Sequence, residues 1–190
     1  MARTDQGSQA GGISCFVVDK ETDGLLFGAQ ERKLGWHSQP TASVIFDNCR
    51  VPSANMVGQP GDGFKIAMQG LDGGRLNIGA CSLGGGQRCL DDAVGYVKER
   101  RQFGQRIADF QNTQFMLADM KTQLEAARAL LYIAADKVSK NAIDKTQWAA
   151  MAKLLTTETG SKVVNDALQL HGGYGFLRDF PVERFMRDLR

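Results

Sequence analysis

The chain has 190 residues, 43% of them hydrophobic and 23% charged, which suffices to bury the core of one large or two modest globular domains. Its 23 basic and 21 acidic residues leave a formal charge of +2, so no global field indicates a nucleic acid or a membrane surface as partner. Four cysteines without a Cys-x-x-Cys pair, beside only two histidines, predict free thiols in a reducing compartment and neither a zinc site nor a disulfide framework.

Short apolar runs dominate the first part of the chain. Residues 13–18, 25–27 and 42–51 are rich in β-branched and aromatic side chains and are separated by glycine, Asp-Gly and proline, a pattern typical of strands and turns. We expect no earlier element to pair with the first run. No apolar run approaches the roughly 18 residues of a membrane span, so we expect a soluble protein. Residues 1–58 are predicted to form part of a β-domain.

From about residue 64 the apolar spacing becomes helical. The pattern predicts a short helix over 64–71 and a long one over 76–97, whose Gly84-Gly85-Gly86 we expect to permit a close helix contact. Further helices are predicted from about 110 to 140, from about 146 to a glycine stop at Gly172-Gly173, and from Pro181 onward. Residues 59–190 therefore read as an antiparallel bundle of three long helices and a truncated fourth.

The breaks between helices are the candidate sites. Arg100 to Gly104 can be read as a basic helix cap, or, with Arg106 nearby and Gln111 at the start of the next helix, as a pyrophosphate site. The turn over 169–175 can be a simple C-cap, or its glycines can let a flat ligand approach the backbone. No strand precedes that turn, so it is not a dinucleotide-binding fingerprint.

A third segment places an acid and a base three residues apart. Asp72 and Arg75, separated by Gly73 and Gly74, could form an intrahelical ion pair or could hold a charged ligand. Residue chemistry alone leaves both interpretations open.

Taken together, these motifs resemble the C-terminal helical domain of the acyl-CoA dehydrogenase family. The resemblance rests on Arg100-x-x-Phe103-Gly104, Gln111, Gln169-x-x-Gly172-Gly173-x-Gly175 and Met186-Arg187-Asp188. Upstream, Gly35-Trp36-x-Ser38, Ile45-Phe46-Asp47 and Val51-Pro52 resemble the end of the family's β-domain. The implied fold is mainly α: a C-terminal four-helix bundle with its last helix truncated, preceded by the second half of a small β-domain.

The resemblance also implies a cofactor and its contacts. Members of the family bind FAD, and the matching residues come partly from a neighbouring subunit, which implies a homo-oligomer, typically a tetramer. The residues of this chain that match the cofactor-binding positions are Arg100, Phe103, Gln111, Gln169, Leu170, His171, Gly172 and Gly173.

The matching acyl-CoA site would be lined by Asp72, Gly73, Gly74 and Arg75. Segments 70–78 and 36–40 look most like the isobutyryl-CoA dehydrogenase branch, which serves valine degradation and passes its electrons to an electron-transfer flavoprotein. Such proteins lie in the mitochondrial matrix of eukaryotes or the cytoplasm of bacteria.

One family feature does not match. The catalytic glutamate follows the Met-Arg-Asp helix in most members, beyond Arg190, and in two branches it precedes the arginine that Arg75 matches, where this chain has Gly74. We therefore assign no catalytic residue and expect the 190 residues alone to be inactive. Two alternatives stay open: another flavoenzyme of this fold, such as an acyl-CoA oxidase or nitroalkane oxidase, or a non-catalytic helical module for oligomerisation or binding.

Overall fold

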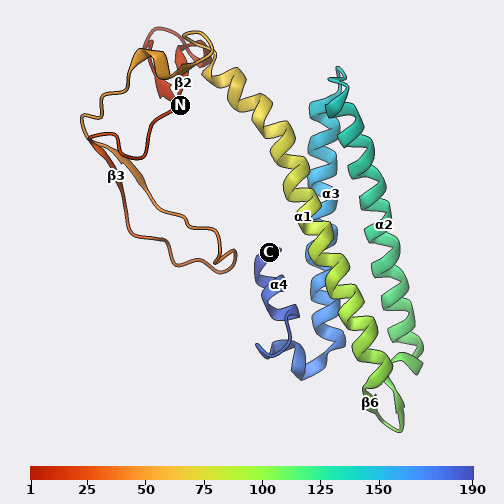
Figure 1. Ribbon diagram of the computed structural model, residues 1–190. Helices are drawn as coiled ribbons and strands as arrows, with labels where there is room; N and C mark the ends of the chain where they lie inside the picture. The colour runs from red at the N-terminus through yellow and green to blue at the C-terminus, as the bar shows by residue number, and fades with distance from the viewer. The chain divides into compact units, whose positions relative to one another are not determined.

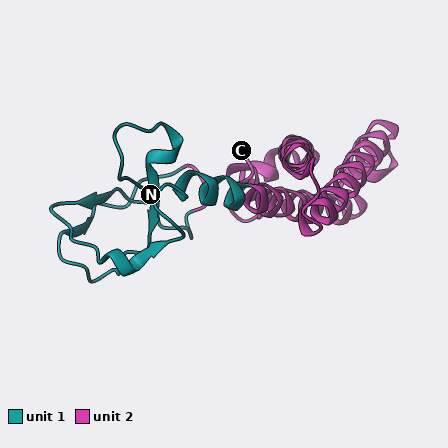
Figure 2. Cartoon of the chain, turned by 90° about the horizontal axis from the view of Figure 1, so that it is seen from above, with its two compact units in different colours: residues 1–33, 37–71 teal, residues 34–36, 72–190 magenta.

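The computed structural model describes residues 1–190, and long helices dominate it (Figure 1). The chain divides into two compact units: unit 1 comprises residues 1–33 and 37–71, and unit 2 comprises residues 34–36 and 72–190 (Figure 2). The domain boundary expected between residues 58 and 59 stays a prediction. Along the chain, unit 1 ends at Leu71 and unit 2 continues from Asp72, within the helix Gly63–Glu99. None of the helices combines the length and apolar character needed to cross a membrane.

Unit 1 is built from short antiparallel strands. β2 (Ile13–Phe16) lies between β1 (Ala2–Arg3) and β5 (Met56–Val57) in a three-stranded sheet, and β3 (Leu25–Phe27) pairs with β4 (Val44–Phe46). The predicted strands are therefore present: the one at 25–27 matches its apolar run, and those in 13–18 and 42–51 are shorter than theirs. The expectation that nothing precedes the first run was wrong, because Ala2 pairs with Ser14.

Helix α1 runs without interruption from Gly63 to Glu99, over 37 residues. The prediction of two separate helices was wrong. A glycine in a helix interior costs up to about 1 kcal/mol relative to alanine. Burial of an apolar side chain contributes more than that, and Leu83, Leu90 and Val97 of this helix are all buried. Tertiary packing thus keeps α1 continuous through its glycines.

The remaining helices follow the predicted pattern. α2 spans Gln111–Ser139, α3 spans Lys145–Leu170, and the short α4 spans Val182–Asp188 after Pro181. Of the apolar side chains that the spacing places on one face of α2, Leu117 is half-buried against the core, and the following are buried: Met120, Leu124, Ala127 and Leu131. All four helices contribute side chains to one hydrophobic core in unit 2.

Glycines bring α1 and α3 close together. A Cβ atom on Gly160 of α3 would lie 2.8 Å from the carbonyl oxygen of Ser82, and one on Gly86 would lie 3.5 Å from the Cα of Gly160. The shorter distance leaves no room for a side chain on Gly160. The close helix contact predicted for the glycines at 84–86 is therefore present at Gly86, whereas Gly84 borders open space and Gly85 packs against Leu189.

Candidate functional site

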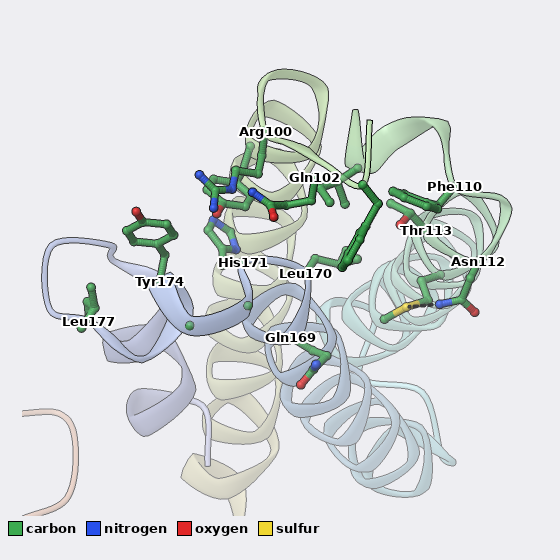
Figure 3. A pocket seen from close by; sticks show the side chains of 16 residues that line it. Arg100, Gln102, Phe110, Asn112, Thr113, Gln169, Leu170, His171, Tyr174 and Leu177 are labelled. Carbon is green, nitrogen blue, oxygen red and sulfur yellow. Dashed lines mark hydrogen bonds between the residues drawn. The ribbon is translucent and has the colours of Figure 1, made fainter. Parts of the chain in front are cut away.

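An open cavity of about 850 Å³ lies at the end of the bundle where α1 and α3 end and α2 begins (Figure 3). We call it the helix-end groove. It brings together segments that are far apart in the sequence, because antiparallel helices return to the same end of a bundle. Its lining residues are Tyr96, Arg100, Gln102, Phe103, Ile107, Phe110, Asn112, Thr113, Met116, Gln169, Leu170, His171, Gly172, Gly173, Tyr174 and Leu177.

Seven of the eight residues predicted to bind a cofactor line this groove. Only Gln111 does not: its side chain is exposed at the start of α2, between the lining residues Phe110 and Asn112. The groove therefore unites both breaks between helices that the sequence singled out.

A tight β-hairpin forms one wall. β6 (Arg101–Gln102) and β7 (Gln105–Arg106) are joined by Phe103 and Gly104, with φ values of 52° and 83°. Two positive φ angles define the type I′ turn that suits a two-residue hairpin. Phe103 is 90% exposed at the tip, so burial within the chain does not explain an aromatic residue in this backbone conformation. Its ring meets Phe110 edge-on, with centroids 6.4 Å apart.

Arg100 supplies a cation that no carboxylate neutralises. It follows the last residue of α1, and its guanidinium carbon lies 5.3 Å from the ring centroid of Tyr174. None of the ion pairs in the structure includes Arg100, and no aspartate or glutamate lines the groove. Figure 3 shows this side chain beside His171. Its guanidinium N–H groups remain available to an anionic ligand.

Arg106, which the sequence grouped with Arg100, has a different role. Its guanidinium forms two hydrogen bonds to the carboxylate of Asp109, at 3.1 and 2.8 Å, and it does not line the groove. The hydrogen bond from Arg106 holds the pKa of Asp109 below its usual value. Arg106 therefore stabilises the turn after the hairpin, η3 (Ile107–Asp109), and is not free for a ligand.

The start of α2 presents unpaired backbone donors. Its N-cap is Phe110, whose side chain cannot accept a hydrogen bond, and the first helical bond runs from Gln114 N–H to the Phe110 carbonyl at 3.2 Å. The backbone N–H groups of residues 111–113 have no partner within the chain. With Asn112 and Thr113 lining the groove, this positive helix end and Arg100 place hydrogen-bond donors and positive charge along the same cavity.

The end of α3 closes the opposite side. Gly172 has φ +59°, the left-handed conformation that ends many helices, so the predicted glycine stop is confirmed. A Cβ on Gly175 would lie 2.4 Å from the Leu168 carbonyl, which explains that glycine by packing within the chain. Gly173 is different: a Cβ there would meet nothing within 4 Å, and its φ is not positive. It leaves open space where it borders the groove.

A cluster of aromatic rings stands behind Arg100. His171 is 4% exposed, and its Nδ1 lies 2.8 Å from the carbonyl oxygen of Ala167, which can only accept a hydrogen bond. The imidazole stacks on Tyr96 with centroids 4.5 Å apart, and the rings of Tyr174 and Phe180 complete the cluster. These contacts fix the position of the Tyr174 ring, over which the Arg100 guanidinium lies.

The segment predicted to bind substrate lies elsewhere. Asp72 is 5% exposed; it pairs with Arg75 at 2.8 Å and accepts a hydrogen bond from Thr146 of α3 at 2.9 Å. The intrahelical ion pair considered from the sequence is thus present. About 24 helical residues separate Asp72 from Tyr96, or roughly 36 Å along α1, so this segment and the helix-end groove are distinct places.

Gly73 and Gly74 border open space. A Cβ on either would meet nothing within 4 Å, so packing within the chain does not require a glycine at these two helical positions. They leave the backbone of α1 accessible beside the Asp72–Arg75 pair.

Several groove residues were missed from the sequence. Tyr96, Phe110 and Met116 lie on helices or beside them and carry only the periodic apolar signal of a bundle core. Tyr174 lies between glycines in the turn over 169–175, where the glycines and not the aromatic ring indicated a site. Spacing in one dimension does not distinguish an apolar side chain that faces the core from one that lines a groove.

Comparisons with known proteins agree with this geometry. Residues 61–190 match the family model described as acyl-CoA dehydrogenase, C-terminal domain. The mitochondrial isobutyryl-CoA dehydrogenase of Dictyostelium discoideum is 51% identical over all 190 residues, which cover 46% of that protein. The chain spans about half the length of the curated relatives it matches.

Two solved structures have the same fold. Butyryl-CoA dehydrogenase of Megasphaera elsdenii superposes with a TM-score of 0.95 at 43% identity, over 99% of this chain and 49% of that one. A chain from a structure described as an electron transferring flavoprotein of Acidaminococcus fermentans gives 0.96 at 46% identity, again over 99% and 49%. The expected mainly helical fold with its helical C-terminal domain is thereby confirmed.

Proposed function

The chain belongs to the acyl-CoA dehydrogenase family, and we propose on that basis that it forms part of an FAD-dependent enzyme that converts a short or branched acyl-CoA to the enoyl-CoA. Within that enzyme, its helix-end groove would hold FAD and its Asp72–Arg75 segment would line the acyl-CoA site. The observation that carries the proposal is that the unpaired Arg100 and the uncapped start of α2 line the same groove, which contains no carboxylate.

The groove fits an anionic, partly flat cofactor. Arg100 and the backbone N–H groups at the start of α2 would bind the pyrophosphate of FAD, because both donate hydrogen bonds and carry positive charge. Gly173 would let the cofactor approach the backbone, and Phe103 would pack against it. Gln111, Gln169, Leu170, His171 and Gly172 complete the proposed set. When bound, the flavin supplies the hydride acceptor.

The acyl-CoA site is proposed at the segment around Asp72 and Arg75. Arg75 is partly exposed beside its buried partner Asp72, and the neighbouring Gly73 and Gly74 leave the backbone open. An arginine fixed by a buried aspartate is a rigid donor for a polar ligand. The 51% identity to a protein named isobutyryl-CoA dehydrogenase favours isobutyryl-CoA as substrate, and hence a place in valine degradation.

This chain would contribute binding and not proton transfer. Removing the α-proton of an acyl thioester requires a base held within reach of that carbon. The helix-end groove contains no carboxylate or thiol, and the position before Arg75 is Gly74. We therefore propose that the 190 residues do not turn over by themselves.

The exposed flavin contacts favour a shared site. Phe103 remains 90% exposed at its hairpin tip despite its contact with Phe110, and Gly173 borders open space. Such exposure fits a cofactor held jointly with a second copy. We propose a homo-oligomer, a tetramer in the full-length protein, with electron-transfer flavoprotein as acceptor. The similarity to a chain from an electron transferring flavoprotein structure supports that acceptor. The compartment would be the mitochondrial matrix in a eukaryote and the cytoplasm in a bacterium.

The test uses a full-length protein that carries these 190 residues. The purified protein should retain FAD and should reduce an artificial electron acceptor with isobutyryl-CoA faster than with butyryl-CoA. Absence of flavin and of turnover from an oligomeric protein would instead identify a non-catalytic helical module. Hydrogen peroxide formation at the full rate with oxygen would identify an oxidase.

The 190-residue chain should be assayed beside it with added FAD and the same acyl-CoA. We expect no turnover, because the position before Arg75 is Gly74 and the nearby Asp72 carboxylate is already paired with Arg75. Robust dehydrogenation by this chain would contradict the proposal that the base lies outside these residues.

A further inference from the structure

The last turn of α4 is held by a loop 152 positions earlier in the sequence. The backbone N–H of Trp36 donates to Oδ1 of Asp188, and the indole Nε1–H of Trp36 donates to the backbone carbonyl of Asp188, both at 2.6 Å. The guanidinium of Arg187 donates to the carbonyl of Leu34 at 3.0 Å. Residues 34–36 belong to the same compact unit as α4, as the colours of Figure 2 show.

The local sequence of this loop is explained by its contact with α4. A Cβ on Gly35 would lie 2.4 Å from the carbonyl oxygen of Arg187, so only glycine fits there. Trp36 has φ +51°, a sparsely populated conformation for a bulky aromatic residue. Its ring is 42% exposed, so burial does not account for that conformation, whereas the paired hydrogen bonds to Asp188 do.

α4 is held from its other side by α1. Leu189, the residue after the helix, packs against Gly85, where a Cβ would lie 2.8 Å from a methyl carbon of that leucine. α4 has only seven residues, too few for a stable isolated helix, so its position must come from contacts at its two ends. Val182, 1% exposed, anchors the start. The end is fixed between Gly85 and residues 34–36.

We propose that Leu34, Gly35 and Trp36 form a clamp that sets the place and direction of residues 187–189. Trp36 contributes most of its hydrogen bonds. The 34–36 clamp does not rest on the proposed function, because every contact that defines it lies within the described chain. It predicts a local effect: loss of the clamp should release the end of α4 and leave the packing of α2 and α3 intact.

The experiment measures amide hydrogen exchange in the 190-residue chain by peptide mapping. Trp36→Phe removes the indole donor and Asp188→Leu removes the side-chain acceptor, so each should accelerate exchange in residues 182–188 by about 3- to 10-fold. Asp188→Asn keeps a carbonyl oxygen for the Trp36 N–H and should stay within 2-fold of the wild type, as a matched control.

A glycine pair tests the close approach separately. Gly35→Ala would force its methyl group against the Arg187 carbonyl and should accelerate exchange in α4 at least as strongly as Trp36→Phe. Gly11→Ala, where a Cβ meets nothing within 4 Å, should leave α4 unchanged.

Two results would overturn the proposal. One is exchange in residues 182–188 of Trp36→Phe and Asp188→Leu that stays within 2-fold of the wild type. The other is acceleration of the same size in α2 and α3, which would show a global loss of stability. Should a variant fail to fold, the wild-type indole decides by NMR: the Trp36 Nε1–H should exchange more slowly than free tryptophan, and an equal rate would refute the clamp.

Discussion

Arg100 and Tyr174 lie at the ends of different helical segments, yet the guanidinium carbon of one is 5.3 Å from the ring centroid of the other. This cation–π contact fixes the arginine without consuming its hydrogen-bond donors, which a salt bridge would do. The arginines at 75, 88, 106, 128 and 187 all pair with acids in the same chain. Arg100 is thus held in place by Tyr174, and its guanidinium N–H groups remain available to bind an anion.

Arg100→Ala should weaken FAD binding by the full-length protein by about 10- to 100-fold, because a charge-assisted hydrogen bond contributes about 1.5–3 kcal/mol. Flavin absorbance retained after dialysis measures the loss. Arg101→Ala is the matched control, since Arg101 is exposed on β6 and does not line the groove. Equal losses from both variants would count against a specific role for Arg100.

The two glycines of the α3 terminus should respond in opposite ways. Gly175→Ala would place a methyl group 2.4 Å from the Leu168 carbonyl and should destabilise the chain by about 1–3 kcal/mol in urea unfolding. Gly173→Ala has open space and should change stability by less than about 0.5 kcal/mol. It should nevertheless lower FAD affinity by about 10-fold, because its methyl group would occupy the groove. Unchanged flavin content in Gly173→Ala would contradict the proposed cofactor approach.

Phe103→Asn should raise the thermal stability of the chain. Relief of a left-handed backbone on a bulky residue is worth about 1–3 kcal/mol, whereas the exposed edge-on contact with Phe110 contributes about 0.5 kcal/mol. Asn-Gly is also the preferred sequence for this turn. Phe103→Ala keeps the strain, loses the contact and should lower the melting temperature. FAD binding should weaken in both variants.

Gly160→Ala should destabilise unit 2 by about 1–3 kcal/mol, because its Cβ would lie 2.8 Å from the backbone oxygen of Ser82 and two helices would have to separate. Gly95→Ala, on an exposed position of α1 with no atom within 4 Å, should stabilise by about 0.4–1 kcal/mol. Chemical unfolding of both variants tests the pair. A stabilising Gly160→Ala would rule out the close backbone approach.

Alkaline pH should act through Cys89. Burial raises the pKa of this thiol from 9.0 to about 12, so the folded chain holds its proton more tightly than the unfolded chain does. The resulting contribution to stability is complete below pH 9 and is lost as the pH rises from 9 toward 12, by up to about 1.4 kcal/mol per unit.

Cys89→Ala removes that dependence while leaving the other alkaline titrations in place. The difference in unfolding free energy between wild type and variant, measured from pH 8 to 11, should therefore change in favour of the variant. A constant difference would show that the Cys89 thiol has the same pKa in the folded and the unfolded chain, so that burial does not raise it.

Most of the helical domain could be predicted from the sequence, because the spacing of apolar residues and the glycines and prolines at helix ends are local properties. The apolar stripe on α2, the stop at Gly172 and the start near Pro181 each follow from the spacing or conformational limits of a few neighbouring residues. The exception was the glycines of α1. Their local cost predicted a break, and burial against the other helices outweighed it.

The family and the two breaks that meet in the groove follow from the sequence, since those motifs are short runs of specific residues. Which cation remains available depends on the fold: Arg100 and Arg106 look alike in sequence, but Asp109 pairs with Arg106 and no acid pairs with Arg100. The fold also packs Gly175 against the Leu168 carbonyl while Gly173 borders open space, and it brings Trp36 within hydrogen-bond distance of Asp188. Packing contacts and ion pairs depend on distances between segments far apart in the chain, which residue order does not specify.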